Sequence, residues 1–185
     1  AIKNKFDVHC LSFDYGQRHK RELFFAKKQV KLQKVNSHKI FKIDFFGGSA
    51  LTDNIKVPIN RNVNEIPDKI PVTYVPARNT IFLSYALGYA EYINAQDIFL
   101  GVNFVDYSGY PDCRPEFIKL FEKLSNIATK KSIEGEKFNI HTPLIKMTKD
   151  QIIRLGTKNK VDLKIQLVVI ILLKKFLAEN VILVY

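Results

Sequence analysis

The start of the chain alternates between short apolar runs and amphipathic segments, a pattern that predicts strands combined with helices. Residues 6–13 alternate between polar and apolar positions, which predicts a β-strand. Its exit turn is predicted at Asp14, Tyr15 and Gly16. Residues 17–34 then change to helical spacing, and the inner face of this predicted helix carries Leu23, Ala26 and Val30.

The same alternation continues toward the other end of the chain. Further strands are predicted at residues 39–45, 97–100 and 138–141. Further helices are predicted at residues 79–93, 115–129 and 148–158. Asn79 or Thr80 is expected to cap the first of these helices, and Thr148 with Gln151 predicts a capping box at the last. Strands that alternate with helices favour a doubly wound, parallel α/β sheet with right-handed crossovers.

Apolar spacing also predicts which helix faces are buried. The expected inner face of residues 79–93 carries Ile81, Phe82, Tyr85, Ala86, Tyr89 and Ala90. The expected inner face of residues 115–129 carries Phe117, Phe121, Leu124 and Ala128. Residues 47–75 show little periodicity and several prolines, which predicts a long loop, and loops of this length are usually functional or mobile.

One predicted connection, residues 102–115, is unusually rich in polar groups. It carries Asp106, Tyr107, Ser108, Tyr110, Asp112, Cys113 and Arg114. It leaves the carboxyl end of a predicted buried strand, where open α/β sheets place their ligand sites. A surface loop held by its own turns is the alternative. Arg78, at the amino end of a predicted helix, suits an anion, because the helix dipole and free N–H groups favour negative charge there; a solvated surface arginine is the alternative.

Composition and charge change this picture only in part. A length of 185 residues predicts one domain. The net charge of +11 favours a polyanionic partner such as RNA. However, 23 of the 29 basic residues are lysines, and bidentate phosphate readout favours arginine, so nucleic acid is not the expected partner. Cys10 and Cys113 lack metal-ligand spacing and predict a cytoplasmic, disulfide-free chain. The apolar run 165–173 is too short to span a bilayer.

Four segments together resemble the 7-cyano-7-deazaguanine synthase family. They are residues 12–19 (SFDYGQRH), 75–79 (VPARN), 106–114 (DYSGYPDCR) and 141–144 (HTPL). They occur in the order and at about the spacing of that family, over residues 5–162. The SGYPDCR run is more specific than a short motif. His141 by itself is expected to be structural.

The resemblance implies a PP-loop ATP pyrophosphatase fold and an ATP-dependent ligase. Such an enzyme converts 7-carboxy-7-deazaguanine and ammonia to 7-cyano-7-deazaguanine, a precursor of queuosine. Adenylation with ATP and Mg²⁺ makes the carboxylate oxygen a leaving group, ammonia gives an amide, and a second activation gives the nitrile. The resemblance also implies contacts with the nucleotide and with the deazapurine. Nucleotide contacts are expected at Phe13, Asp14 and Tyr15, and substrate contacts at Arg78, Asp106, Tyr107, Ser108, Asp112 and Arg114. Family members are often homodimers.

Two parts of the family pattern are absent from this sequence. One is the Ser-Gly-Gly-x-Asp-Ser phosphate loop after an amino-terminal strand, and residues 47–49 do not replace it. Without that strand we expect an unpaired sheet edge. The other is a four-cysteine zinc site, C-x8-C-x2-C-x2-C, because no cysteine follows Cys113. We therefore expect this chain to be impaired or inactive. A tRNA-binding or tRNA-modifying relative and a non-catalytic remnant are the alternatives.

The tail at residues 164–185 departs from the family, whereas residues 1–163 form the incomplete PP-loop domain. Codons exist for the tail that, read from each third base, encode cysteines beginning at Val168, Leu177, Asn180 and Leu183. Their spacing is that of the zinc site. We therefore hypothesise that a frameshift near residues 162–165 replaced a zinc-binding tail.

The frameshift hypothesis predicts a specific DNA sequence. Each of those four codons should end in T, followed by a codon that begins with GT or GC, so that the shifted frame reads TGT or TGC. Sequencing the genomic DNA of this region tests the prediction. A shifted frame without those four cysteine codons contradicts it.

Overall fold

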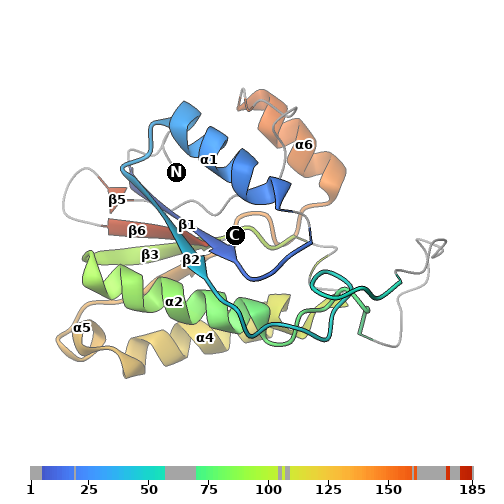
Figure 1. The fold of residues 1–185 in the computed structure, drawn as a ribbon. Helices are drawn as coiled ribbons and strands as arrows, with labels where there is room; N and C mark the ends of the chain where they lie inside the picture. The colour runs from blue at the N-terminus through green and yellow to red at the C-terminus, as the bar shows by residue number, and fades with distance from the viewer. Residues whose placement is uncertain are drawn as a thin grey trace.

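A parallel sheet with helices on both faces forms the body of the protein. The computed structural model describes residues 6–18, 20–56, 70–103, 106, 109–159, 161, 174–175 and 180–184. The sheet has strand order β2-β1-β6-β3-β4, and β5 pairs with β1 outside this path. Helices α1 and α6 lie over one face, and α2, α4 and α5 lie over the other (Figure 1). The predicted doubly wound α/β fold is therefore confirmed.

Two parallel strands and a crossover helix open the fold. Strand β1 (Phe6–Asp14) pairs in parallel with β2 (Ser37–Lys42), and helix α1 (Arg21–Gln33) connects them. The helix begins four residues later than predicted because the turn uses Gln17 and Arg18. The Gln17 side chain bonds the backbone of Phe13 and Tyr15, and the Arg18 N–H donates to the carbonyl of Leu51.

The middle of the sheet is filled by a strand from the far end of the chain. Strand β6 (Asn180–Val184) pairs in parallel with β1 on one side and with β3 (Ala95–Leu100) on the other. The short strand β5 (Lys174–Lys175) pairs antiparallel with the start of β1. The expectation of an unpaired edge is thus wrong, because β6 pairs with both strands that border the centre. The apolar run 165–173 and the proline-rich stretch 57–69 lie outside the described residues.

The second half of the sheet is covered by apolar helices. Helix α2 (Arg78–Tyr92) precedes β3, and α4 (Pro115–Ala128) precedes β4 (Asn139–His141), which pairs in parallel with β3. Helix α4 buries Ile118, Phe121 and Ser125, whereas Leu124 is 48% exposed. The predicted inner face was therefore rotated, because α4 carries apolar residues over a wider arc than the sheet covers. Helix α2 likewise buries Phe82, Leu83, Ala86 and Ala90 but leaves Tyr85 exposed.

The remaining helices are set by local contacts. Helix α6 (Lys149–Lys158) has Thr148 as its N-cap, and Thr148 and Gln151 form both bonds of the predicted capping box.

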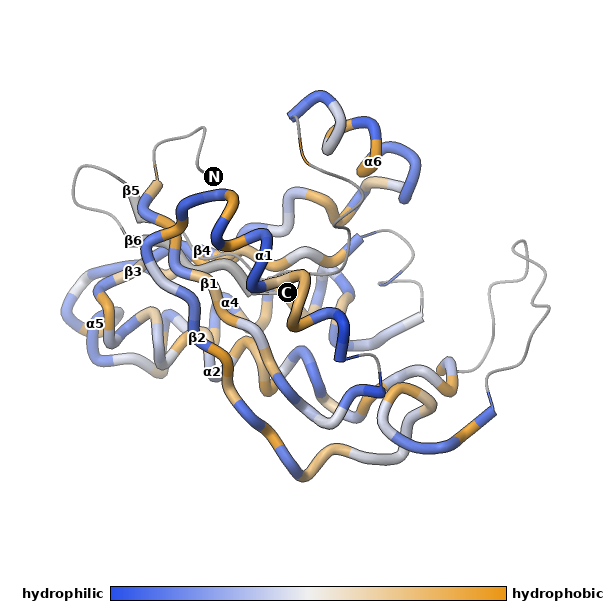
Figure 2. The backbone as a smooth tube through the Cα atoms, turned by 45° about the horizontal axis from the view of Figure 1, so that its top comes forward, coloured by the Kyte–Doolittle hydropathy of each residue, from blue (hydrophilic) through white to orange (hydrophobic). Residues whose placement is uncertain are grey.

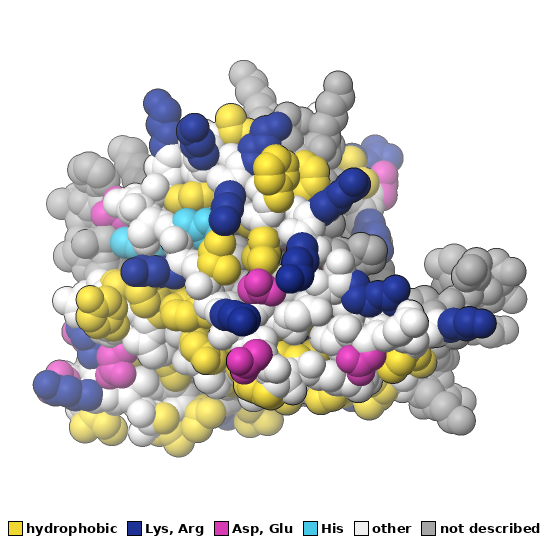
Figure 3. All heavy atoms as spheres, viewed as in Figure 1, with side chains coloured by type: hydrophobic (Ala, Val, Ile, Leu, Met, Phe, Trp, Pro, Cys, Tyr) yellow, Lys and Arg dark blue, Asp and Glu magenta, His cyan; other side chains and the backbone are white. Residues whose placement is uncertain are grey.

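Helices α1 and α6 alternate between hydrophilic and hydrophobic residues (Figure 2). Lysine and arginine side chains are prominent on the face of the molecule that includes α1 (Figure 3). None of the helices in the described ranges is long and apolar enough to cross a membrane.

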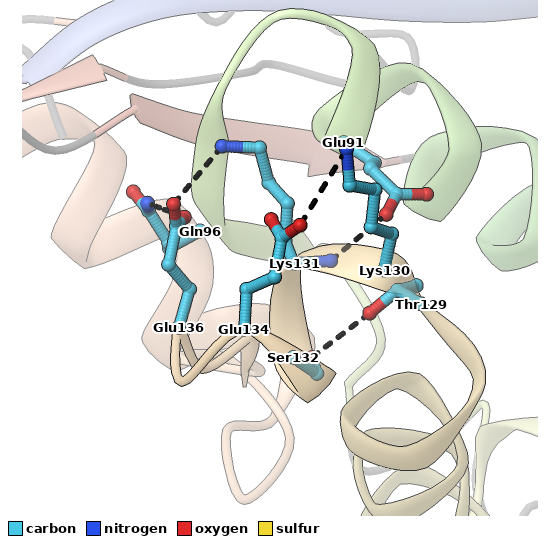
Figure 4. Close-up of polar contacts among 8 residues, drawn as sticks. All are labelled: Glu91, Gln96, Thr129, Lys130, Lys131, Ser132, Glu134 and Glu136. Carbon is cyan, nitrogen blue, oxygen red and sulfur yellow. Dashed lines mark hydrogen bonds and ion pairs between the residues drawn. The ribbon is translucent and has the colours of Figure 1, made fainter.

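A polar cluster joins α5 (Lys130–Ile133), which the sequence did not predict, to α2 and β3 (Figure 4). Glu91 accepts from the backbone N–H of Lys131, and the ammonium of Lys131 pairs with Glu136 at 3.0 Å. Glu136 also accepts from Gln96. Separately, the His141 ring forms a hydrogen bond with the carboxylate of Asp97.

The central position of β6 leads to a prediction about hydrogen exchange. The amides of Val181, Ile182 and Leu183 should exchange about as slowly as those of β1 and β3, because ladder hydrogen bonds in a central strand open only with the sheet. Residue-resolved exchange measured by NMR tests this. The amides of exposed α6 serve as a fast reference. Fast exchange at residues 180–184, alongside slow exchange in β1 and β3, contradicts a central β6.

Candidate active site

The polar site lies where β1 and β3 end and α2 begins. Tyr15 follows β1, residues 101–114 follow β3, and Arg78 is the first residue of α2. Because carboxyl ends of parallel strands meet at one edge of a sheet, these segments converge. The loop also contains a short 3₁₀ turn, η2 (Pro111–Cys113), directly before α4.

Arg78 is partly buried between aromatic rings. Its Nη1 donates to the hydroxyl of Tyr15 at 3.4 Å, and its guanidinium carbon lies 5.8 Å from the Tyr15 ring centre and 6.0 Å from that of Phe82. Both separations suit cation–π attraction. Ala77, which precedes Arg78, is left-handed with φ of 52°, and its N–H donates to the Tyr74 hydroxyl. The turn into α2 thus directs Arg78 toward Tyr15.

Asp112 supplies the cap that α2 lacks within its own sequence. The prediction that Asn79 or Thr80 caps this helix is wrong. The N-cap position is Ala77, whose side chain forms no capping hydrogen bond. Instead the Asp112 carboxylate accepts from the backbone N–H of Asn79 at 2.8 Å. Asp112 is 5% exposed. A carboxylate from another segment therefore already lies at the amino end of α2. This is the place where the helix dipole was expected to favour an anionic ligand next to Arg78.

Asp106 is held differently and is more exposed than Asp112. Its carboxylate accepts from the backbone N–H of Asn103 at 3.2 Å and from the Asn103 side chain. The carbonyl of Asp106 accepts from the N–H of Tyr110, whose hydroxyl lies 2.7 Å from that of Thr73. These bonds tie the loop after β3 to the segment before α2.

The remaining predicted site residues fall into three groups. Phe13 is 3% exposed and stacks on Phe82 at 3.9 Å between ring centres, so its ring belongs to the core. Asp14 ends β1, and Arg114 is exposed directly before α4. Tyr107 and Ser108 lie outside the described residues. Asn79 was predicted only as a cap, and its contacts with the loop could not be found from local sequence.

Burial dominates the titration of the site. It raises the pKa of Asp106 and of Asp112 above the ordinary aspartate value, although backbone donors and Arg78 pull in the opposite direction. Burial also raises the pKa of Tyr15, so the phenol is neutral at pH 7. Burial, together with Asp112 and Asp106, raises the pKa of Cys113 to about 12. The Cys113 thiol is therefore protonated at neutral pH and is not a nucleophile.

The turn at residues 47–53 is not a phosphate cradle. The N–H of Gly48 donates to the Asp53 carboxylate at 2.6 Å, and the N–H of Ala50 donates to the carbonyl of Val72. The amides of Gly48 and Ala50 are thus already bonded within the protein. Among the described residues, no three His, Cys, Asp or Glu side chains could hold a metal ion. The described part of the chain therefore does not fit the four-cysteine zinc site.

This geometry defines a doubly wound α/β protein with its polar site at the carboxyl ends of the strands. Residues 1–168 match the family "Queuosine biosynthesis protein QueC". The chain is 59% identical over 162 residues to the 7-cyano-7-deazaguanine synthase of Rickettsia akari, covering 86% of this chain and 71% of the relative. It is 57% identical over 167 residues to that of Rickettsia canadensis, covering 89% and 74%.

A relative from another genus gives the same result. The 7-cyano-7-deazaguanine synthase of Acetivibrio thermocellus is 55% identical over 164 residues, which cover 88% of this chain and 72% of the relative. The chain belongs to the QueC family. The resemblance stated from the four sequence segments is therefore confirmed.

The cap from Asp112 predicts how its variants behave. Asp112→Ala should cost about 1 kcal/mol, because α2 loses its cap, which corresponds to a melting temperature lower by roughly 2–4 °C. Asp112→Asn should melt near the wild type at pH 7, because an amide oxygen still accepts from Asn79. Asp150→Ala is the control, since Asp150 forms an exposed pair with Arg154. Equal melting temperatures for Asp112→Ala and wild type contradict the cap.

Proposed function

We propose that this chain binds 7-carboxy-7-deazaguanine at Arg78 and the loop after β3, as a 7-cyano-7-deazaguanine synthase. The observation that carries the proposal is Arg78, a partly buried guanidinium that forms no ion pair with a carboxylate in the described part of the chain. A cation held between Tyr15 and Phe82 favours an anionic ligand, because desolvated charge gains from a partner. The name of the relatives, 7-cyano-7-deazaguanine synthase, supplies the product.

The substrate has two features that this site suits. Its carboxylate matches the fork of Arg78, which can donate two parallel hydrogen bonds. Its guanine-like edge offers N–H groups, which carboxylates accept. We assign this acceptor role to Asp106, because Asp112 is 5% exposed and is engaged by Asn79. Tyr107, Ser108 and Arg114 complete the proposed pocket by their place in the same loop.

The proposed reaction requires position and charge rather than a protein nucleophile. ATP with Mg²⁺ is the co-substrate that converts the carboxylate into an acyl adenylate, releasing pyrophosphate, and ammonia then displaces AMP to give the amide. A second adenylation of the amide oxygen, with loss of AMP and protons, leaves the nitrile. Arg78 orients the carboxylate and offsets its charge. Asp14 and Tyr15, at the end of β1, are the residues we propose next to the nucleotide.

We expect this chain to bind ATP weakly. The sequence contains no Ser-Gly-Gly-x-Asp-Ser motif, and the amides of Gly48 and Ala50 are already bonded within the protein. We therefore expect ATP to add little to the affinity for the acid, and turnover to be impaired. Zinc enters no step of this proposal.

Calorimetric titration tests the role of Arg78. The wild type should bind 7-carboxy-7-deazaguanine, with and without ATP. Arg78→Gln should weaken binding of the acid about tenfold or more, because the carboxylate loses its cation. A tenfold loss corresponds to about 1.4 kcal/mol of binding free energy. Binding of 7-deazaguanine, which lacks the carboxylate, should change little in the same variant.

Arg154→Gln is the matched control, since Arg154 is an exposed arginine paired with Asp150 on α6. It should leave both affinities unchanged. If the wild type does not bind the acid, the proposal is contradicted. It is also contradicted if the Arg78→Gln variant binds the acid as tightly as the wild type. A large gain in affinity for the acid on adding ATP contradicts the expected weak binding of ATP.

A further inference from the structure

Asn79 joins the two segments that form the proposed substrate pocket. It is the second residue of α2 and is 6% exposed. Its backbone N–H donates to the Asp112 carboxylate at 2.8 Å. Its side-chain Nδ2 donates to the thiol sulfur of Cys113 at 2.9 Å and, at 3.4 Å, to the carbonyl of Asp112. One residue thus binds the η2 turn by both its backbone and its side chain.

The other end of the same amide faces the neighbouring arginine. Oδ1 of Asn79 accepts from Nε of Arg78 at 3.4 Å. The planar amide therefore lies between the Arg78 guanidinium and the η2 turn. Asparagine is one of the few side chains of this size that can donate and accept at once, since a carboxylate only accepts and an alkyl group does neither.

We propose that Asn79 is a positioning residue, which holds Arg78 and the loop after β3 in the geometry that binds the substrate carboxylate. This inference rests on the proposed function for its ligand, but its structural part does not. Loss of the side chain removes the bond to Cys113 and the support of Arg78 together. The Asp112 cap remains in such a variant, because it uses the backbone of Asn79. The helix is therefore expected to persist while the η2 turn loosens.

Thiol labelling tests the structural part without any ligand. In Asn79→Ala, a thiol reagent should modify Cys113 about tenfold faster than in the wild type, because the turn opens locally. Peptide mass spectrometry reports the two cysteines separately. Cys10 is fully buried in β1 and measures global unfolding. Its rate should rise less than that of Cys113.

Asn126→Ala is the matched control for loss of a bonded asparagine. The Asn126 amide bonds the backbone N–H and carbonyl of Phe138, and so joins α4 to the segment before β4. This variant should be destabilised without selective labelling of Cys113. Cys113→Ser should keep a hydrogen-bond acceptor for Nδ2 of Asn79 and should bind the acid as the wild type does. Cys113→Ala should lose that acceptor.

Binding separates a positioning role from a merely stabilising one. Asn79→Ala should weaken 7-carboxy-7-deazaguanine about tenfold but 7-deazaguanine much less, because the effect passes through Arg78. Asn79→Asp should also weaken the acid at neutral pH, since a carboxylate cannot donate to Cys113 and offers Arg78 a competing partner. Asn126→Ala should leave both affinities unchanged once the folded fraction is accounted for.

The outcomes are distinguishable. Selective labelling of Cys113 and a loss confined to the carboxylate ligand support the proposal. Labelling of Cys113 that only follows Cys10 overturns it, as does equal weakening of both ligands. If the wild type binds neither ligand, the proposed function fails. Labelling then decides alone whether Asn79 holds the η2 turn.

Discussion

Backbone pairing across the centre of the sheet is the constraint on which the site depends. Tyr15 follows β1, and the loop of Asp106 and Asp112 follows β3. These two strands are not neighbours, because β6 lies between them and pairs with both. The distance between the two halves of the site is therefore set by one strand width on each side of β6, about 4.8 Å each. A strand that comes last in the sequence thus fixes the relation of residues that come much earlier.

A second constraint is the negative charge at the start of α2. The Asp112 carboxylate caps the helix from another segment, and its burial is the main reason its pKa is raised. Since the folded state holds this proton more tightly than an ordinary aspartate, the contribution of Asp112 to stability falls as pH rises through its raised pKa. The cap also means that the amino end of α2 already faces a carboxylate of the protein itself. Arg78 contacts both Tyr15 and Asn79, and it is the cation that we propose for the substrate carboxylate.

The features that could be predicted from sequence are the ones that short-range patterns determine. The parallel fold follows from alternating periodicities, and α6 was placed closely because Thr148 and Gln151 carry its start signal within four residues. The cap of α2 could not be placed, because Asp112 lies 33 residues from Asn79. The central place of β6 was missed for the same reason. Its partners are in β1 and β3, and nothing in residues 180–184 identifies them.

The chemistry of the site follows from what its groups cannot do. Cys113, with a pKa of about 12, does not attack a substrate at neutral pH, and the Tyr15 phenol is neutral. The described part of the site then offers the guanidinium of Arg78 and carboxylates held by donors. In the function that we propose, such a site acts by alignment, and a misplacement of about 1 Å can cost on the order of a hundredfold in rate. On that proposal, residues that hold others in place, such as Asn79 and Asp112, should matter as much as the residues that touch the ligand.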